Sequence, residues 1–145
     1  MWFSCYDQLD DKDLEYMMSI YPIKLIEDED WPNGKLCPTE FSYSDKDIKV
    51  KKSYYLLGDP CLWLMHEYVH AFMLNVHGTR PKINDKYPDN SIETCAFVNQ
   101  FRRLIANGVN TDTIMNNVKF KCLKRYFIEY SDIMNKYWNR AMELT

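Results

Sequence analysis

The chain lacks any pair of cysteines at CxxC spacing, although it holds five cysteines. They are odd in number and widely scattered, which indicates free thiols in a reducing compartment and no disulfide framework. The same scatter argues against a structural zinc site built from cysteine ligands. We therefore expect a cytoplasmic protein with reduced thiols at Cys5, Cys37, Cys61, Cys95 and Cys122.

The chain also lacks a long apolar run and a leader of basic followed by apolar residues. A membrane-spanning helix needs about 18 apolar residues or more, so we expect no such helix and no signal peptide. The formal net charge of −3 gives no electrostatic reason to bind nucleic acid or an anionic membrane surface. We expect neither of these as a partner, and the oligomeric state stays open.

No internal repeat, low-complexity tract or long linker divides the 145 residues. This length is enough for one domain to bury a core unaided. A hydrophobic fraction of 46% with 15% aromatics is typical of a folded globule and not of a disordered chain. We therefore expect a single domain that spans residues 1–145.

The first part of the chain predicts one helix and three short strands. Residues 7–20 favour a helix that ends at Tyr21-Pro22, with an inner side formed by Leu9, Leu14, Met17 and Met18. Segments 23–29, 39–43 and 48–54 predict strands, separated by turn residues at 32–34 and 44–47. We expect these strands to form a small antiparallel sheet.

The second part of the chain predicts helices. Residues 60–77 favour a helix with Asp59 as N-cap and Gly78 as its stop, followed by a polar loop at 79–90. The next helix is expected at 91–106, and residues 111–144 predict one long helix or two with a break near Asn116-Asn117. The fold class expected is α+β, with the small sheet followed by a helical half.

The most specific motif is His66-Glu67-x-x-His70, which has HExxH spacing. On a helix the two histidines lie one turn apart on one face, where both imidazoles can reach a single tetrahedral zinc. Glu67 lies about 100° round the helix from His66, and there it can act as general base on a water held by the metal. Two alternatives remain: the histidines bond to backbone carbonyls in an ordinary buried helix, or the motif arises by chance in a helical interaction protein.

An apolar stripe at helical spacing accompanies the motif and is expected to anchor this helix against the core. The stripe consists of Met65, Val69, Phe72 and Val76.

A catalytic zinc usually has three protein ligands, and Glu93 is the best candidate for the third. It shares a helical face with Phe97, Phe101 and Leu104, and a carboxylate on an apolar stripe is costly unless it is paired or bound to metal. The alternative is a capping box in which Asn90 is the N-cap and Glu93 its reciprocal partner.

The other candidates fit less well. His77 would lie about 10 Å beyond His70 on a continuous helix. Asp85 and Asp89 are typical of turns, and Glu129 of a solvated helix face. Cys61 and Cys95 are close to the histidines in sequence, but Cys61 lies more than one turn ahead of His66.

HExxH followed by Glu93 on a second helix resembles the gluzincin branch of zinc metallopeptidases. The segment from Glu93 to Phe101 also resembles the second helix of the ImmA/IrrE-type small metallopeptidases, and the likeness covers residues 46–105. The chain lacks the Asn-Glu pair and the downstream aspartate of thermolysin-type enzymes, with Thr94 and Phe97 at those places, and it has no later histidine of the SprT-like branch.

The resemblance implies a minimal zincin-like fold and a zinc-dependent peptidase that acts on a protein or peptide. His66, His70 and Glu93 would bind Zn²⁺, and Glu67 would be the general base. It also implies a sheet beside the active-site helix whose edge strand aligns an extended substrate. The segment 48–54 is the expected edge, and its lysines would either favour acidic substrates or block aggregation.

The donor that stabilises the oxyanion cannot be chosen among 11 tyrosines. Tyr68 is expected to point away from the metal, and Tyr126 and Tyr130 stay open.

A different class of function is also open, because a short chain leaves little room for a deep substrate cleft. In that case the chain is a catalytically inactive, metal-binding zincin-like domain that acts as a structural or regulatory interaction module.

Overall fold

The computed structural model describes residues 6–78 and 87–145. Cys5, Asp85 and most of the loop expected at 79–90 lie outside these residues. The described elements are, in chain order, α1 Asp11–Ile20, β1 Ile23–Ile26, η2 Asp28–Asp30, β2 Thr39–Ser42, β3 Asp47–Lys51, α2 Lys52–Leu56, α3 Trp63–His77, α4 Ser91–Ala106, α5 Thr111–Asn116, η3 Val118–Phe120, α6 Lys121–Glu129 and α7 Ser131–Glu143.

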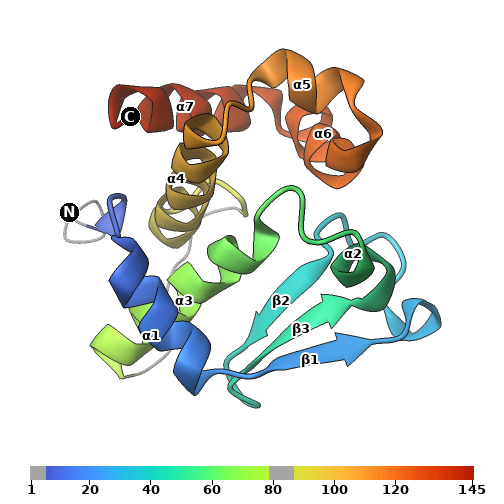
Figure 1. Cartoon of the computed structure of the whole chain (residues 1–145), viewed down its shortest axis with the longest axis vertical. Coiled ribbons are helices and arrows are strands. Elements are labelled where there is room, and N and C mark those ends of the chain that lie inside the picture. The colour runs from blue at the N-terminus through green and yellow to red at the C-terminus, as the bar shows by residue number, and fades with distance from the viewer. Residues whose placement is uncertain (1–5, 79–86) are drawn as a thin grey trace.

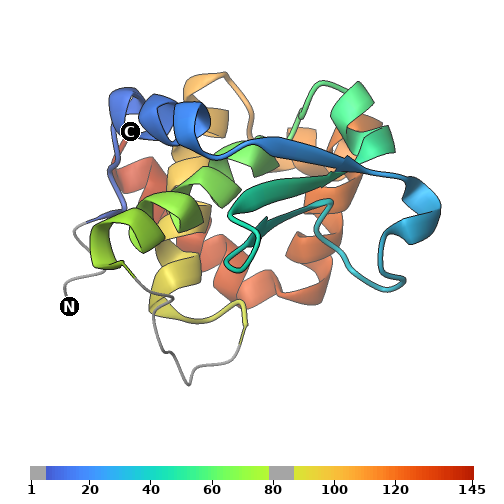
Figure 2. The ribbon, with the colours of Figure 1, turned by 90° about the horizontal axis from the view of Figure 1, so that it is seen from below.

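The elements are stacked, with the small sheet at one end and α7 at the other (Figure 1). Helix α3 lies between the sheet and α4: it contacts β2 and α1 on one side and α4 on the other. Helix α4 in turn packs on α7, and the view turned by 90° shows α5 and α6 behind the sheet and α7 behind α3 and α4 (Figure 2). The HExxH segment lies on α3 and is therefore in the middle of the molecule.

The three expected strands are present, but the prediction of a purely antiparallel sheet is wrong. The strand order is β1-β3-β2, with β2 antiparallel and β1 parallel to β3. After β1 the chain runs through η2 and a loop before it forms β2, so it does not turn directly back on β1. The tight turn after β2 then inserts β3 between the two earlier strands, parallel to β1.

Strand β3 is therefore central, and the expectation that residues 48–54 form the substrate-binding edge is wrong. Ile48 and Val50 are fully buried, and the chain enters α2 at Lys52. Lys49 is also paired: it bonds to Asp45 at 2.7 Å and to Asp47 at 2.8 Å. The edge next to α3 belongs to β2 instead.

Helix α3 begins three residues later than predicted, at Trp63, because Leu62 has a left-handed backbone with φ of 58°. Asp59 still caps the helix: its carboxylate accepts hydrogen bonds from the N–H groups of Trp63 at 2.8 Å and Leu64 at 3.2 Å. The predicted stop is confirmed, since Gly78 has φ of 74° and donates its N–H to the Leu74 carbonyl.

The expected apolar stripe describes the burial of α3 only in part. Val69 is fully buried, but Val76 is 45% exposed, and His66, Glu67 and His70 are buried as well. The reason is that α3 is covered on two sides, by β2 and by α4, so that no single face carries the contacts. Met18 of α1, which was also expected to face the core, is 44% exposed.

The prediction for helix α4 is confirmed, whereas residues 111–144 form three α-helices and not one or two. Helix α4 has the predicted bounds, with Asn90 as N-cap and Asn107 as C-cap. The predicted break near Asn116-Asn117 separates α5 from η3, and a second break at Tyr130 separates α6 from α7. The aromatic core of this half includes Phe97 stacked on Tyr137, with ring centroids 5.6 Å apart.

The four cysteines among the described residues form no disulfide, as expected from their scatter. In the ranges 6–78 and 87–145, no helix combines the length and apolar character needed to span a membrane.

We predict that Asp59 makes the stability of the fold depend on pH. Burial raises the pKa of Asp59 from 3.8 to about 6, although the hydrogen bonds that its carboxylate accepts act to lower the pKa. Between pH 4 and pH 6 the folded state therefore binds more protons than the unfolded state. The contribution of Asp59 to the free energy of unfolding is present below pH 4 and is lost as pH rises through 6. We expect a loss of roughly 2–3 kcal/mol, because one pKa unit corresponds to about 1.4 kcal/mol.

Urea unfolding of the wild type and of Asp59→Asn at several pH values from 4 to 7 measures this effect. Asparagine keeps an oxygen that can accept from the Trp63 N–H group but does not titrate. The stability difference between the two proteins should change across this range, and two parallel curves would contradict the prediction.

Candidate metal centre

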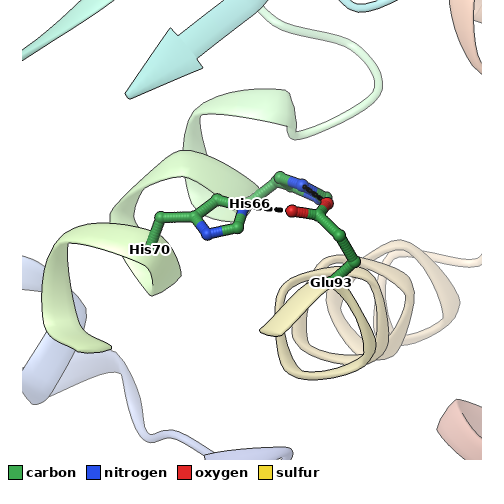
Figure 3. Close-up of side chains that lie close together, drawn as sticks. All are labelled: His66, His70 and Glu93. Atoms are coloured by element: carbon green, nitrogen blue, oxygen red, sulfur yellow. Dashed lines mark hydrogen bonds and ion pairs between the residues drawn. The ribbon is translucent and has the colours of Figure 1, made fainter. Parts of the chain in front are cut away.

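His66 and His70 on α3 meet Glu93 on α4 (Figure 3). One ligand atom from each residue lies within 4.8 Å of the others. The Glu93 carboxylate bridges the two imidazoles: Oε1 lies 3.0 Å from His66 Nε2 and Oε2 lies 3.0 Å from His70 Nε2. All three side chains are buried. The three residues predicted as ligands are thus in one place.

Helix packing brings Glu93 to the histidines. Phe97 is fully buried and its ring contacts the His66 ring, with centroids 4.5 Å apart. Glu93 lies one turn before Phe97 on α4, so the same contact places its carboxylate beside the imidazoles. The burial of Phe97, Phe101 and Leu104 confirms the predicted core-facing stripe.

Of the two hydrogen bonds of the alternative, a capping box, only the one accepted by the Asn90 side chain is formed. Asn90 accepts a hydrogen bond from the Glu93 backbone N–H at 2.8 Å, as an N-cap does. The Glu93 side chain does not return to Asn90 but bonds to His66 and His70. The carboxylate is therefore available to a metal while the helix is still capped.

Gln100 determines which nitrogen of His66 faces Glu93. The Gln100 amide nitrogen donates to the Cys61 carbonyl at 2.8 Å, so its oxygen is the atom 2.9 Å from His66 Nδ1. Nδ1 therefore carries a hydrogen and donates it to Gln100. In neutral His66 this leaves the Nε2 lone pair directed at Glu93 Oε1.

A lone pair that faces a carboxylate oxygen at 3.0 Å is stable only with a cation, either a proton or a metal ion, between the two atoms. Burial by itself raises the pKa of Glu93, but the charge of His70 and the hydrogen bonds of His66 and His70 lower it well below its usual range. Two imidazole nitrogens and one buried carboxylate suit a divalent ion. These residues can therefore bind a metal ion.

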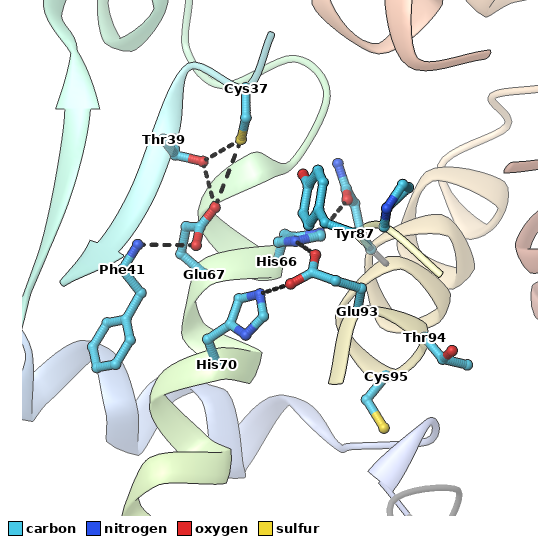
Figure 4. Close-up of polar contacts among 12 residues, drawn as sticks. Cys37, Thr39, Phe41, His66, Glu67, His70, Tyr87, Glu93, Thr94 and Cys95 are labelled. Atoms are coloured by element: carbon cyan, nitrogen blue, oxygen red, sulfur yellow. Dashed lines mark hydrogen bonds and ion pairs between the residues drawn. The ribbon is translucent and has the colours of Figure 1, made fainter. Parts of the chain in front are cut away.

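Glu67, the predicted general base, points to the opposite side of α3, toward β2 (Figure 4). Its Oε1 accepts the Phe41 backbone N–H at 3.0 Å and its Oε2 accepts the Thr39 hydroxyl at 2.8 Å. The Cys37 thiol lies 3.8 Å from Oε2. The carboxylate is thus held by the edge strand and the residues just before it.

A pocket of about 500 Å³ joins the two parts of the site. Its wall includes His66, Glu67, His70 and Glu93, together with residues of β2 and three tyrosines, Tyr87, Tyr126 and Tyr130. The general-base candidate and the candidate ligands therefore open into one space. Such a volume is within the range of small-molecule and peptide sites, so the short chain does form a cleft.

The remaining candidate ligands are not part of this group. His77 is exposed, and its ring packs against Tyr6 with centroids 6.1 Å apart. Asp89 and Glu129 are exposed, and Asp85 lies outside the described residues.

The two candidate cysteines are also elsewhere. The Cys61 sulfur lies 3.5 Å from that of Cys122, and Cys95 points away from the histidines (Figure 4).

Several residues of the site have little or no signal in the sequence. Gln100 had a weak signal, because it lies two turns beyond Glu93 on the same face of α4. No sequence signal pointed to Cys37, Thr39 or Tyr87. These residues reach the site through strand pairing and packing between segments that are distant in sequence.

We predict that Gln100→Leu weakens metal binding by about 10–100-fold, the usual effect of removing a hydrogen-bond partner of a ligating histidine. The variant keeps the ligands but loses the acceptor for His66 Nδ1–H. Zinc affinity measured by competition with a chromogenic chelator reports the change. Cys95→Ala is the matched control, a buried change on the same helix that should leave the affinity as it is; an equal loss in both variants would contradict the prediction.

Comparison of the chain with protein-family models, with curated proteins and with solved structures finds no match. What the site does must therefore be inferred from its own residues.

Proposed function

We propose that this protein is a zinc-dependent peptidase with a minimal zincin-like fold of the gluzincin branch, similar to the ImmA/IrrE-type enzymes. One observation supports this best: the two histidines of an HExxH helix meet a glutamate of the next helix in a pocket that Glu67 also lines. The histidine pair, the third ligand and the base occur together in the arrangement that metal-assisted hydrolysis needs.

His66, His70 and Glu93 would hold the zinc ion. Zinc bound there would lower the pKa of water and polarise the carbonyl of the scissile peptide bond. The Gln100 oxygen orients His66 by accepting its Nδ1–H, and the burial of all three ligands excludes competing solvent.

Glu67 would take the proton of the attacking water and return it to the leaving amine. Thr39 and the Phe41 N–H group hold its two oxygens, so the carboxylate cannot swing away from the pocket. Positioning of this kind makes a general base effective, because proton transfer requires hydrogen-bond distance.

The substrate class proposed is a protein or peptide in extended conformation. Strand β2 is the sheet edge that lines the pocket, through Thr39, Glu40 and Phe41. An extended segment laid along this strand would pass the metal ligands and hydrogen-bond to main-chain groups of the strand other than the Phe41 N–H, which already donates to Glu67.

A second candidate function is a catalytically inactive, metal-binding domain that acts as a structural or regulatory interaction module. The contacts of Glu67 favour it, because they join α3 to β2 and give this carboxylate a structural task without catalysis.

The variant Glu67→Gln separates the two functions. For a peptidase we expect hydrolysis of unfolded casein and of a peptide library to fall by about 10²–10⁴-fold, with one zinc per chain retained. Glu40→Gln is the matched control, since Glu40 lines the same pocket but is exposed and pairs with Lys35. Zinc content by mass spectrometry and product formation by chromatography are measured on each protein.

A zinc-loaded wild type that cleaves nothing, with a Glu67→Gln variant that is only less stable, would favour the interaction module. Equal hydrolysis by the wild type and Glu67→Gln would rule out Glu67 as the base.

A further inference from the structure

Two tyrosine hydroxyls meet in the wall of the pocket. The Oη atoms of Tyr87 and Tyr126 lie 2.6 Å apart, and both residues line the pocket together with the candidate metal ligands. Neither hydroxyl has a task in the metal site described so far.

Tyr126 is fixed relative to the histidines by aromatic packing. It is only 2% exposed, and its ring lies 5.1 Å from Trp63 and 5.8 Å from Phe97. These two rings also contact His66, with centroids 5.0 Å and 4.5 Å from the imidazole. Tyr126 and His66 thus share two neighbours, which holds the hydroxyl in a constant position beside the ligands.

The pair holds two hydrogens, and only one of them can lie between the two oxygens. When Tyr87 donates to Tyr126, the hydrogen of Tyr126 is free to point into the pocket. Burial of Tyr126 is the main cause that raises its pKa, so this phenol keeps its hydrogen at neutral pH. A hydroxyl that accepts one hydrogen bond is also a better donor for the next.

We propose that Tyr126 donates a hydrogen bond to the oxygen of the scissile carbonyl as negative charge develops on it, and that Tyr87 positions Tyr126 for this task. Tyr126 is then a catalytic residue, and Tyr87 acts through it. This inference rests on the proposed peptidase function and supplies the oxyanion donor that the ligands and Glu67 do not provide.

Tyr130 offers a matched control. It lines the same pocket, and its ring lies 5.7 Å from that of Tyr126. No hydroxyl partner joins it to the pair among the described residues. Loss of its hydroxyl should therefore leave catalysis unchanged, whereas a general effect of removing a pocket hydroxyl would appear in all three tyrosines.

The test compares Tyr126→Phe, Tyr87→Phe and Tyr130→Phe with the wild type in two measurements. The first is kcat and KM for a peptide that the wild type cleaves. The second needs no turnover: the affinity of the cobalt-loaded protein for inorganic phosphate, a tetrahedral oxyanion, followed in the visible spectrum.

We expect Tyr126→Phe to lower kcat by about 10²–10³-fold with KM little changed, as for the loss of one oxyanion donor. Its phosphate affinity should fall by about 10-fold, the effect of losing roughly one hydrogen bond, while its cobalt affinity is unchanged. Tyr87→Phe should change kcat and phosphate affinity in the same direction by less, and Tyr130→Phe should match the wild type.

A Tyr126→Phe variant with wild-type kcat and wild-type phosphate affinity would overturn the proposal. If the cobalt-loaded wild type cleaves no peptide, the peptidase function fails, and the phosphate affinities alone decide whether Tyr126 is an oxyanion donor. A wild type that binds no cobalt would overturn both.

Discussion

The structure depends on one buried carboxylate, that of Glu93, placed between two imidazoles of the neighbouring helix. An ionised carboxylate in the core is strongly unfavourable unless a cation or donors satisfy it, so the α3–α4 interface must bring both histidines to it. Phe97 and Gln100, one and two turns further along α4, contact the same histidine from the side. The contacts that pack α3 against α4 therefore also form the candidate metal site.

Side chains from little more than one turn of α3 face two sides of this helix. His66 and His70 face α4, while Glu67 faces the sheet and is held there by Thr39 and the Phe41 N–H group. Because both sides open into one pocket, α3 alone brings the two histidines and Glu67 to it, and α4 adds Glu93. The C-terminal helices complete the wall with Tyr126, which is fixed on the aromatic core behind His66.

Local signals in the sequence predicted much of this. The bounds of α4, the stop at Gly78 and the placement of Glu93 follow from caps and apolar periodicity, which act within a few residues. The sheet was predicted less well, since the position of β3 between β1 and β2 depends on the path of the loop after β1 and not on strand propensity. The partners of the site residues, such as Gln100 for His66 and Thr39 for Glu67, come from segments far apart in sequence, and periodicity carries no information on such pairs.

Anomalous diffraction at the zinc edge, on crystals of protein purified without chelator, tests the central claim most directly. We expect one zinc ion bound by Nε2 of His66, Nε2 of His70 and the Glu93 carboxylate, with a coordination position open to the pocket that Glu67 and Tyr126 line. Absence of an anomalous peak at these residues, or a peak closed by a fourth protein ligand, would contradict a hydrolytic metal centre.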